Sequence, residues 1–92
     1  MKDGVPRAVE LEKLAYTMGI GWRRLGHRLG IQESVLEEID GGNEQPSEKV
    51  YHMLMLWKQK YGFHATYKVL YDALVHDLVG RRDLAEKFCF NE

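Results

Sequence analysis

The chain has 92 residues, of which 45% are hydrophobic and two are proline, and this is enough material for one hydrophobic core but not for two. The 13 Lys and Arg residues nearly balance the 14 Asp and Glu residues, so net charge provides no overall attraction to nucleic acid or to an anionic membrane. Cys89 is the only cysteine, which excludes an intramolecular disulfide and a cysteine-based metal cluster. We expect a single domain over residues 1–92, with its core at about 8–90.

Two features of the sequence bear on the compartment. No apolar stretch approaches the roughly 18 to 20 residues that cross a bilayer, and residues 1–10 lack the apolar centre of a secretory signal. A lone cysteine also favours a reducing environment. We therefore expect an intracellular, cytoplasmic protein without a membrane span, with the nucleus as the alternative compartment.

Apolar residues recur along the chain at the spacing i, i+3, i+4, i+7, which places them on one face of a helix. No segment alternates apolar and polar residues with a period of two, as a half-buried strand would, so we predict an all-α fold. We expect both tryptophans to fill the core, because large aromatic residues on such a face are usually buried. The apolar faces comprise Leu11, Leu14, Ala15 and Met18; Trp22, Leu25, Gly26 and Leu29; Leu36 and Ile39; Val50, Met53, Leu54 and Trp57; Leu70, Ala73 and Leu74; and Leu84, Ala85 and Phe88.

Glycine and proline mark the boundaries between the predicted helices. Pro46 suits the first turn of the fourth helix, where its missing N–H would be unpaired in any case. Thr66 is the expected cap of the fifth helix, and Asp83 is expected in the first turn of the sixth. A glycine follows each of the first five helices and can adopt the left-handed conformation that ends a helix. These are Gly19 and Gly21, Gly30, Gly41 and Gly42, Gly62, and Gly80.

Charge is segregated along the chain. The second predicted helix is basic, the third is acidic, and residues 49–68 contain lysines but no acid. Such blocks suit electrostatic pairing with a similar molecule, and they are equally typical of ordinary solvated helix faces. The basic block comprises Arg23, Arg24 and Arg28, and the acidic block includes Glu33, Glu37 and Glu38.

No motif in the sequence indicates catalysis. The four histidines are scattered and form no HExxH pair, and no glycine-rich phosphate loop is present. Cys89 lacks an evident base to activate its thiol. We predict that the chain is not an enzyme and has no catalytic site, cofactor, metal site or small-molecule substrate.

DNA binding is the alternative from another functional class. Residues 22–40 have the spacing of a helix-turn-helix, with Leu25, Gly30 and Ile31 placed as in bacterial repressors. The second of these helices carries only acidic charged groups, and these would face the phosphates of the groove. We therefore consider nucleic acid an unlikely partner, reached mainly through the arginines of the preceding helix.

Several runs of residues resemble the death domain family. The run from Trp22 to Ile31, followed by Leu36 to Ile39, resembles the second and third helices of that fold. The run from Met53 to Trp57 and the closing run from Arg82 to Glu86 resemble its fourth to sixth helices. The resemblance covers Ala8 to Phe88 and implies a six-helix antiparallel Greek-key bundle. Gly26 departs from the family pattern, in which alanine is more frequent, and we expect close helix packing there.

The resemblance also implies a function, which is docking onto other death domains. The family assembles through three asymmetric contacts, and asymmetric contacts propagate instead of closing. This implies an adaptor-like module that builds homotypic or heterotypic complexes in apoptotic or NF-κB-type signal transduction, while a non-apoptotic scaffold stays open as an alternative. By position, the first contact would pair Arg7, Glu10 and Lys49 with Arg23, Arg24 and Arg28. The second contact would pair Lys58, Lys60 and Tyr61 with Arg81, Arg82 and Asp83. The third contact would bring Glu33, Glu37 and Glu38 against the loops around Gly19 and Asn43.

Overall fold

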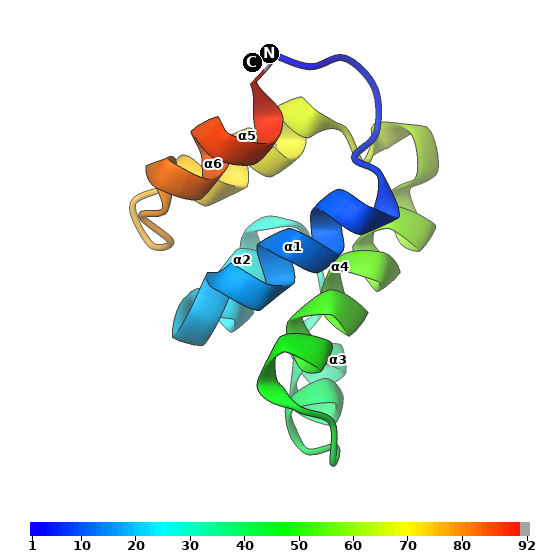
Figure 1. The fold of residues 1–92 in the computed structure, drawn as a ribbon. Helices are drawn as coiled ribbons and strands as arrows, with labels where there is room; N and C mark the ends of the chain where they lie inside the picture. Colours follow the sequence, from blue (N-terminus) through cyan, green and yellow to red (C-terminus); the bar gives the residue numbers. More distant parts are fainter. Residues whose placement is uncertain (91–92) are drawn as a thin grey trace.

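The computed structural model describes residues 1–90, which form helices joined by short turns (Figure 1). No strand occurs in this part of the chain, and this confirms the all-α prediction. The longest helix, α4, packs mainly against α1, while α5 pairs with α6. The elements are α1 (Ala8–Met18), the 3-10 turn η1 (Gly19–Gly21), α2 (Trp22–Arg28), α3 (Glu33–Asp40), α4 (Pro46–Tyr61), the 3-10 turn η2 (Gly62–His64), α5 (Tyr67–Val75) and α6 (Arg82–Cys89).

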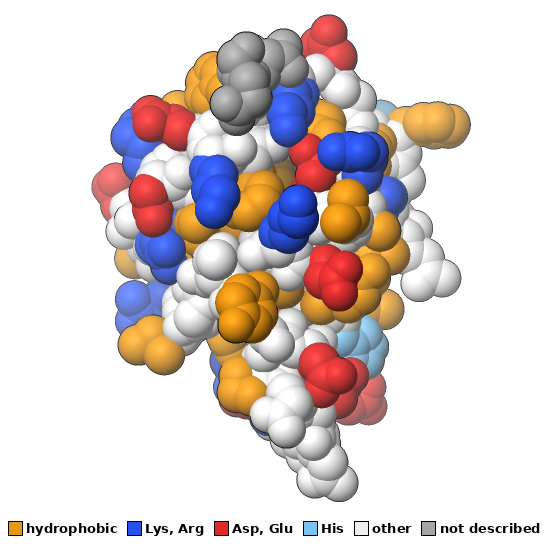
Figure 2. Space-filling view, viewed as in Figure 1, with side chains coloured by type: hydrophobic (Ala, Val, Ile, Leu, Met, Phe, Trp, Pro, Cys, Tyr) orange, Lys and Arg blue, Asp and Glu red, His pale blue; other side chains and the backbone are white. Residues whose placement is uncertain are grey.

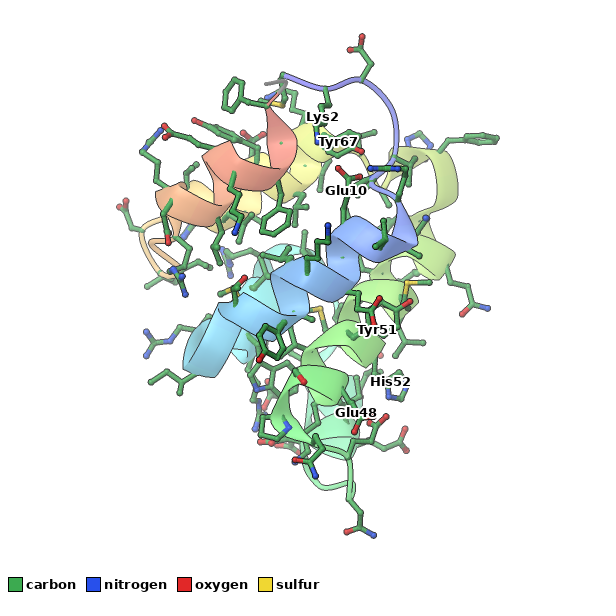
Figure 3. All side chains as sticks on the ribbon, viewed as in Figure 1. Lys2, Glu10, Glu48, Tyr51, His52 and Tyr67 are labelled. Atoms are coloured by element: carbon green, nitrogen blue, oxygen red, sulfur yellow. The ribbon has the colours of Figure 1, made fainter. Side chains whose placement is uncertain are left out.

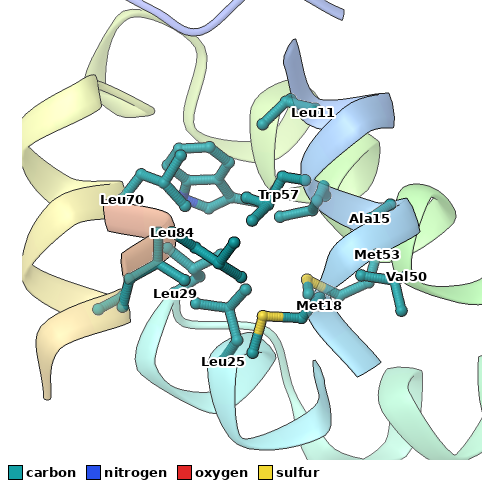
Figure 4. Packing of buried hydrophobic residues seen from close by; sticks show 14 of the residues in the cluster. Leu11, Ala15, Met18, Leu25, Leu29, Val50, Met53, Trp57, Leu70 and Leu84 are labelled. Carbon is teal, nitrogen blue, oxygen red and sulfur yellow. The ribbon is translucent and has the colours of Figure 1, made fainter. Parts of the chain in front are cut away.

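The predicted apolar faces meet in one hydrophobic cluster, and Trp57 lies at its centre (Figure 4). The Trp57 ring is 1% exposed and is surrounded by side chains from α1, α2, α5 and α6. Trp22 is only partly buried and packs against the edge of the cluster. The expectation that both tryptophans fill the core is therefore confirmed for Trp57 and wrong in part for Trp22, which begins α2 and lines a surface hollow.

Most of the predicted helix boundaries agree with the structure. The Thr66 hydroxyl accepts the N–H of Val69 at 3.2 Å and caps α5, and Pro46 is the first residue of α4. Gly30, just after α2, has a φ of 86°, which an L-residue rarely adopts. The predicted end of the fifth helix at Gly80 is wrong, because the backbone becomes extended at His76 and a separate turn follows.

Close packing of α2 explains the glycine at position 26. A β-carbon built on Gly26 would lie 2.7 Å from Leu36 Cδ2 and 3.4 Å from Met53 Cγ. A side chain there would force the buried Leu36 side chain or α2 itself to shift. This confirms the predicted close approach and explains why the usual cost of glycine in a helix is tolerated.

Candidate interaction surfaces

The amino-terminal segment is fastened across α1, α5 and α6 by a buried cluster around Glu10. The backbone N–H of Lys2 donates to the carbonyl of Cys89 at 2.7 Å, and the N–H of Tyr67 donates to the carbonyl of Gly4 at 3.0 Å. Lys2 Nζ donates to Glu10 Oε2 at 2.8 Å, and the Tyr67 hydroxyl donates to Glu10 Oε1 (Figure 3). The Arg7 N–H donates to the same Oε1 at 2.9 Å. The carboxylate is therefore fully engaged within the molecule.

Burial and hydrogen bonding act on the Glu10 cluster in opposite directions. Burial alone would raise the pKa of the Glu10 carboxyl, but the hydrogen bonds from Lys2, Tyr67 and the Arg7 backbone outweigh it and lower the pKa to about 2. Burial and the Glu10 charge raise the pKa of Tyr67 to about 12. Glu10 is 8% exposed. Its placement in the first contact type is therefore wrong, because the side chain that would meet a partner is occupied in fastening the fold.

A second charge cluster, which we call the Arg23 cluster, ties α2, α3 and α4 together at the surface. The guanidinium of Arg23 donates to Asp40 Oδ2 at 3.0 Å and also to Glu33 Oε2. Lys49 Nζ donates to the backbone carbonyl of Asp40 at 2.6 Å, and His27 Nε2 lies 2.6 Å from Glu33 Oε1. Arg23, Glu33 and Lys49 belong to predicted contacts with partners, yet the structure brings them together within one molecule.

Four other charged residues on α2 and α3 are not engaged in contacts of this kind. Arg24 and Arg28 on α2, and Glu37 and Glu38 on α3, are exposed. Within residues 1–90, none of the four side chains forms an ion pair or a hydrogen bond. Because their charges are not neutralised by the fold, they are the charges of α2 and α3 that a partner can reach at little cost. Among the predicted contact residues of α2 and α3, these four are the ones that are exposed and unpaired within residues 1–90.

The residues of the predicted second contact divide in a similar way. Arg81 donates to the carbonyl of Met18 at 2.9 Å and pairs with Asp83 at 3.1 Å, so it joins the start of α6 to the end of α1. The Arg81 hydrogen bond also lowers the pKa of the exposed Asp83 carboxyl. Arg82, which is exposed, donates to the Tyr71 hydroxyl at 2.9 Å. Arg81 and Asp83 therefore support the fold, while Arg82 stays within reach of a partner.

At the other half of this contact, the end of α4 rests on the turn after α2. The Tyr61 hydroxyl donates to the carbonyl of Gly30 at 3.1 Å, and Lys60 Nζ donates to the same atom at 3.3 Å. Lys58 is half-buried and has no ion-pair partner in the described part of the chain. Tyr61 is thus a contact between helices, whereas the two lysines keep this end of α4 positive.

Several hydrophobic residues are highly exposed, and two of them, Ile20 and Phe63, are not among the predicted contacts. Ile20 in η1 is 99% exposed, Phe63 in η2 is 93% exposed, and Tyr16 on α1 is 81% exposed. Phe63 carries no periodic signal because it follows Gly62, outside every α-helix. Its only local sign is an aromatic residue in a glycine-bounded turn. Ile20 and Tyr16 border a hollow of about 400 Å³ between α1, α2 and α4.

Neither a metal centre nor a membrane span is evident from the geometry of residues 1–90. His52 pairs with Glu44 at 3.2 Å, but no group of three His, Cys, Asp or Glu side chains in this range could hold a metal ion. None of the helices in the same range has the length and apolar character needed to cross a bilayer. The surface features that stand out are therefore charges and apolar side chains.

Comparison with known proteins gives one match and two negative results. The family model for the death domain matches residues 9–90. No curated protein and no solved structure matches the chain. The match begins within α1 and ends just after α6, so it covers every helix described above and agrees with the resemblance carried by the two tryptophan runs. The chain belongs to the death domain family.

Proposed function

We propose that this chain assembles with other death domains, of the same or a different protein, to build signalling complexes. The observation that carries the proposal is the family match over residues 9–90, because death domains are protein–protein interaction modules and not enzymes. Charges left without partners on α2 and α3 support it, since opposite charges on two such surfaces can steer and align an encounter. Each exposed ion pair contributes only about 0 to 1 kcal/mol, so stable assembly requires several contacts at once.

We extend the proposal to the order of the helices, the cellular compartment and the signalling pathway. The helices follow the six-helix antiparallel Greek-key order of the family, as one domain over residues 1–92. The chain acts in the cytoplasm as an adaptor-like module that oligomerises in apoptotic or NF-κB-type signalling. The near-neutral net charge and the single buried cysteine are compatible with that setting.

The structure sharpens which residues we assign to direct contact. In our proposal Arg24 and Arg28 present positive charge to a partner, and Glu37 and Glu38 present negative charge. Lys58, Lys60 and Arg82 serve the contact between the end of α4 and the start of α6. Lys60 and Arg82 also bond within the chain, but they are exposed. The remaining predicted contact residues, all of which bond within the chain, shape the edges of these surfaces; they are Arg23, Glu33, Lys49, Tyr61, Arg81 and Asp83.

The test is capture of the chain by a panel of purified death domains, compared with a variant in which Arg24 and Arg28 are changed to glutamate. We expect the unaltered chain to capture at least one member and the variant to lose that capture while its helical circular dichroism is unchanged. Arg23 is left in place, because its removal would break the ion pairs to Glu33 and Asp40 and confound the result.

The matched control carries Lys13→Glu and Lys87→Glu, which change the same charge on a different face. Figure 2 shows that the face bearing α1 and α6 is also rich in Lys and Arg, interspersed with hydrophobic side chains. Neither lysine has an ion-pair partner within residues 1–90. We expect the control to retain capture. Failure of every panel member to bind the unaltered chain, or equal binding by the Arg24 and Arg28 variant, would contradict the proposal.

A separate titration measures whether the chain binds duplex DNA. Two carboxylates of α3 are paired with Arg23, and Glu37 and Glu38 remain exposed, so this helix would carry negative charge into a groove. We expect no sequence-dependent binding of labelled duplex at physiological salt. Binding below about 1 µM that depends on sequence would favour the helix-turn-helix interpretation.

A further inference from the structure

The surface between α5 and α6 holds a tyrosine hydroxyl against an arginine. Arg82 Nη1 donates a hydrogen bond to the Tyr71 hydroxyl oxygen at 2.9 Å. Arg82 is exposed and Tyr71 is half-buried. The Tyr71 ring packs edge-on against Phe90, with the ring centroids 5.3 Å apart. Packing therefore fixes the ring, while the hydroxyl meets a guanidinium group that is in contact with solvent.

Two other tyrosines have hydroxyls that are engaged inside the fold. The Tyr67 hydroxyl donates to Glu10, and Tyr67 is only 6% exposed. The Tyr61 hydroxyl donates to the carbonyl of Gly30 at 3.1 Å, and a β-carbon built on Gly30 would collide with that hydroxyl. Neither hydroxyl has room for an added group unless the helices around it shift.

The remaining two tyrosines are more accessible but lie in less favourable electrostatic surroundings. Tyr51 lines two depressions beside Glu44 and Glu48, and no Lys or Arg among residues 1–90 lines either of them. Tyr16 is 81% exposed and has charges of both signs around it. The charged residues in the depressions beside Tyr16 are Glu12, Lys13, Glu48 and Lys87. Tyr71 is thus the one tyrosine within residues 1–90 whose hydroxyl contacts a cationic side chain at the surface.

The charges around the Tyr71 hydroxyl favour a bound anion. Arg82 forms no ion pair with an acid within residues 1–90, and it is the first residue of α6, where free backbone N–H groups make the helix end positive. A guanidinium group binds phosphate through two parallel hydrogen bonds, more strongly than it binds a neutral hydroxyl. Glu86, one turn further along α6, is exposed and can turn its side chain to solvent. The other charges beside this surface neutralise each other in pairs, Arg81 with Asp83 and Lys68 with Asp72.

We propose that Tyr71 is a site of tyrosine phosphorylation and that Arg82, together with the start of α6, holds the phosphate. A tyrosine kinase transfers the γ-phosphoryl group of ATP. The Tyr71 oxygen forms a bond to phosphorus, the bond from that phosphorus to ADP breaks, and the phenolic proton passes to a base of the kinase. Phosphotyrosine carries a charge of about −1.5 to −2 at pH 7. The start of α6, from Arg81 to Asp83, therefore changes from net positive to net negative.

The modification acts on a residue that the proposed function assigns to partner contact. Arg82 is exposed, and in that proposal it presents positive charge at the start of α6. A phosphate bound to Arg82 occupies the guanidinium group and reverses the local charge, so a partner surface that recognises positive charge there is released. This regulation rests on the proposed function, whereas the modification site and the contact between phosphate and Arg82 do not.

Mass spectrometry tests whether the site is modified in the folded chain. A tyrosine kinase catalytic domain is chosen that phosphorylates a synthetic peptide of residues 66–76, and it is then incubated with the folded chain, Mg²⁺ and ATP. We expect tandem mass spectrometry to locate phosphate on Tyr71. Modification of the peptide without modification of Tyr71 in the folded chain would overturn the proposal.

Thermal unfolding tests whether Arg82 holds the phosphate. Phosphotyrosine is installed during synthesis at position 71 of the whole chain and, in a matched control sample, at position 51. We expect the melting temperature to rise by about 4 °C or more for position 71 and not to rise for position 51, which lies beside Glu44 and Glu48. Arg82→Gln, at an exposed position, should preserve the circular dichroism and remove the rise. Equal shifts at the two positions, or a rise that persists with Arg82→Gln, would overturn the proposal.

Capture by a partner death domain tests the regulation. We expect the chain phosphorylated at Tyr71 and the Arg82→Glu variant both to bind the partner at least about tenfold more weakly than the unmodified chain does. Full binding by the phosphorylated chain together with weak binding by Arg82→Glu would overturn the regulatory role. If no death domain captures even the unmodified chain, the proposed function fails, and the mass and melting measurements still decide the modification site.

Discussion

The Glu10 cluster and the Arg23 cluster use the same chemistry in different surroundings. Glu10 is buried and accepts hydrogen bonds from Lys2, Tyr67 and the backbone of Arg7. Arg23 joins two carboxylates across α2 and α3, but its side chain and those of its partners are 34% to 50% exposed. Water weakens the exposed pairs and is largely excluded from the buried ones. Burial, more than the number of ion pairs, therefore decides how much a charged group contributes to the stability of the fold.

Removal of the Glu10 carboxylate tests the buried half of the comparison most strongly. We expect Glu10→Ala to lower the free energy of unfolding by about 2 to 4 kcal/mol, because the Tyr67 hydroxyl and the Lys2 ammonium lose their shared partner. Urea denaturation followed by circular dichroism measures the change. Glu12→Ala, at an exposed position two residues away, is the control and should stay within about 0.5 kcal/mol of the unaltered chain. If the two changes lower the free energy of unfolding equally, the buried cluster does not stabilise the fold more than an exposed carboxylate does.

Acid should weaken the buried cluster in a defined range of pH. The pKa of Glu10 is lowered in the folded chain from 4.5 to about 2, so the charged carboxylate stabilises the fold above pH 4.5 and this contribution is lost as the pH falls toward 2. By linkage the loss amounts to about 3 kcal/mol. The measurement is the unfolding free energy against pH for the unaltered chain and for Glu10→Gln. The difference between the two proteins should shrink between pH 4.5 and 2, and a constant difference would argue against the lowered pKa.

The exposed half of the comparison predicts a much smaller effect. We expect Arg23→Ala to lower the free energy of unfolding by about 0.5 to 1 kcal/mol, although it removes two ion pairs. Raising the salt concentration should reduce even this difference, because exposed pairs are screened. The same urea titration, at low and high salt, provides the measurement. If Arg23→Ala lowers the free energy of unfolding as much as Glu10→Ala does, the surface cluster stabilises the fold as strongly as the buried one.

Much of the fold follows from local patterns in the sequence. The apolar faces containing Leu14, Leu54 and Leu70 are buried as predicted, and Thr66 caps α5. The helix spacing, glycine positions and capping residues that support these predictions all lie within a few residues of one another. The end of α5 at Val75 is the exception, because a glycine five residues later is the stronger local signal.

The candidate contact surfaces are less predictable, because they depend on residues that are distant in the chain. Glu10 and Tyr67 are 57 positions apart, and Arg23 and Asp40 are 17 apart, so no local pattern shows that their side chains meet. The family resemblance directs attention to the charged faces of α2 and α3. It does not show that Glu10 is buried or that Phe63 protrudes from its turn, since both properties arise only once the helices pack together.

We propose above all that the charges left unpaired by the fold bind other death domains. The most direct test measures the association constant between this chain and a death domain that captures it, as salt concentration rises, for the unaltered chain and for the variant with Arg24→Glu and Arg28→Glu. The claim predicts that binding of the unaltered chain weakens with salt, and that the variant binds at least about tenfold more weakly at low salt while its unfolding free energy changes by less than about 0.5 kcal/mol. Equal affinity and equal salt dependence for the two proteins would contradict it.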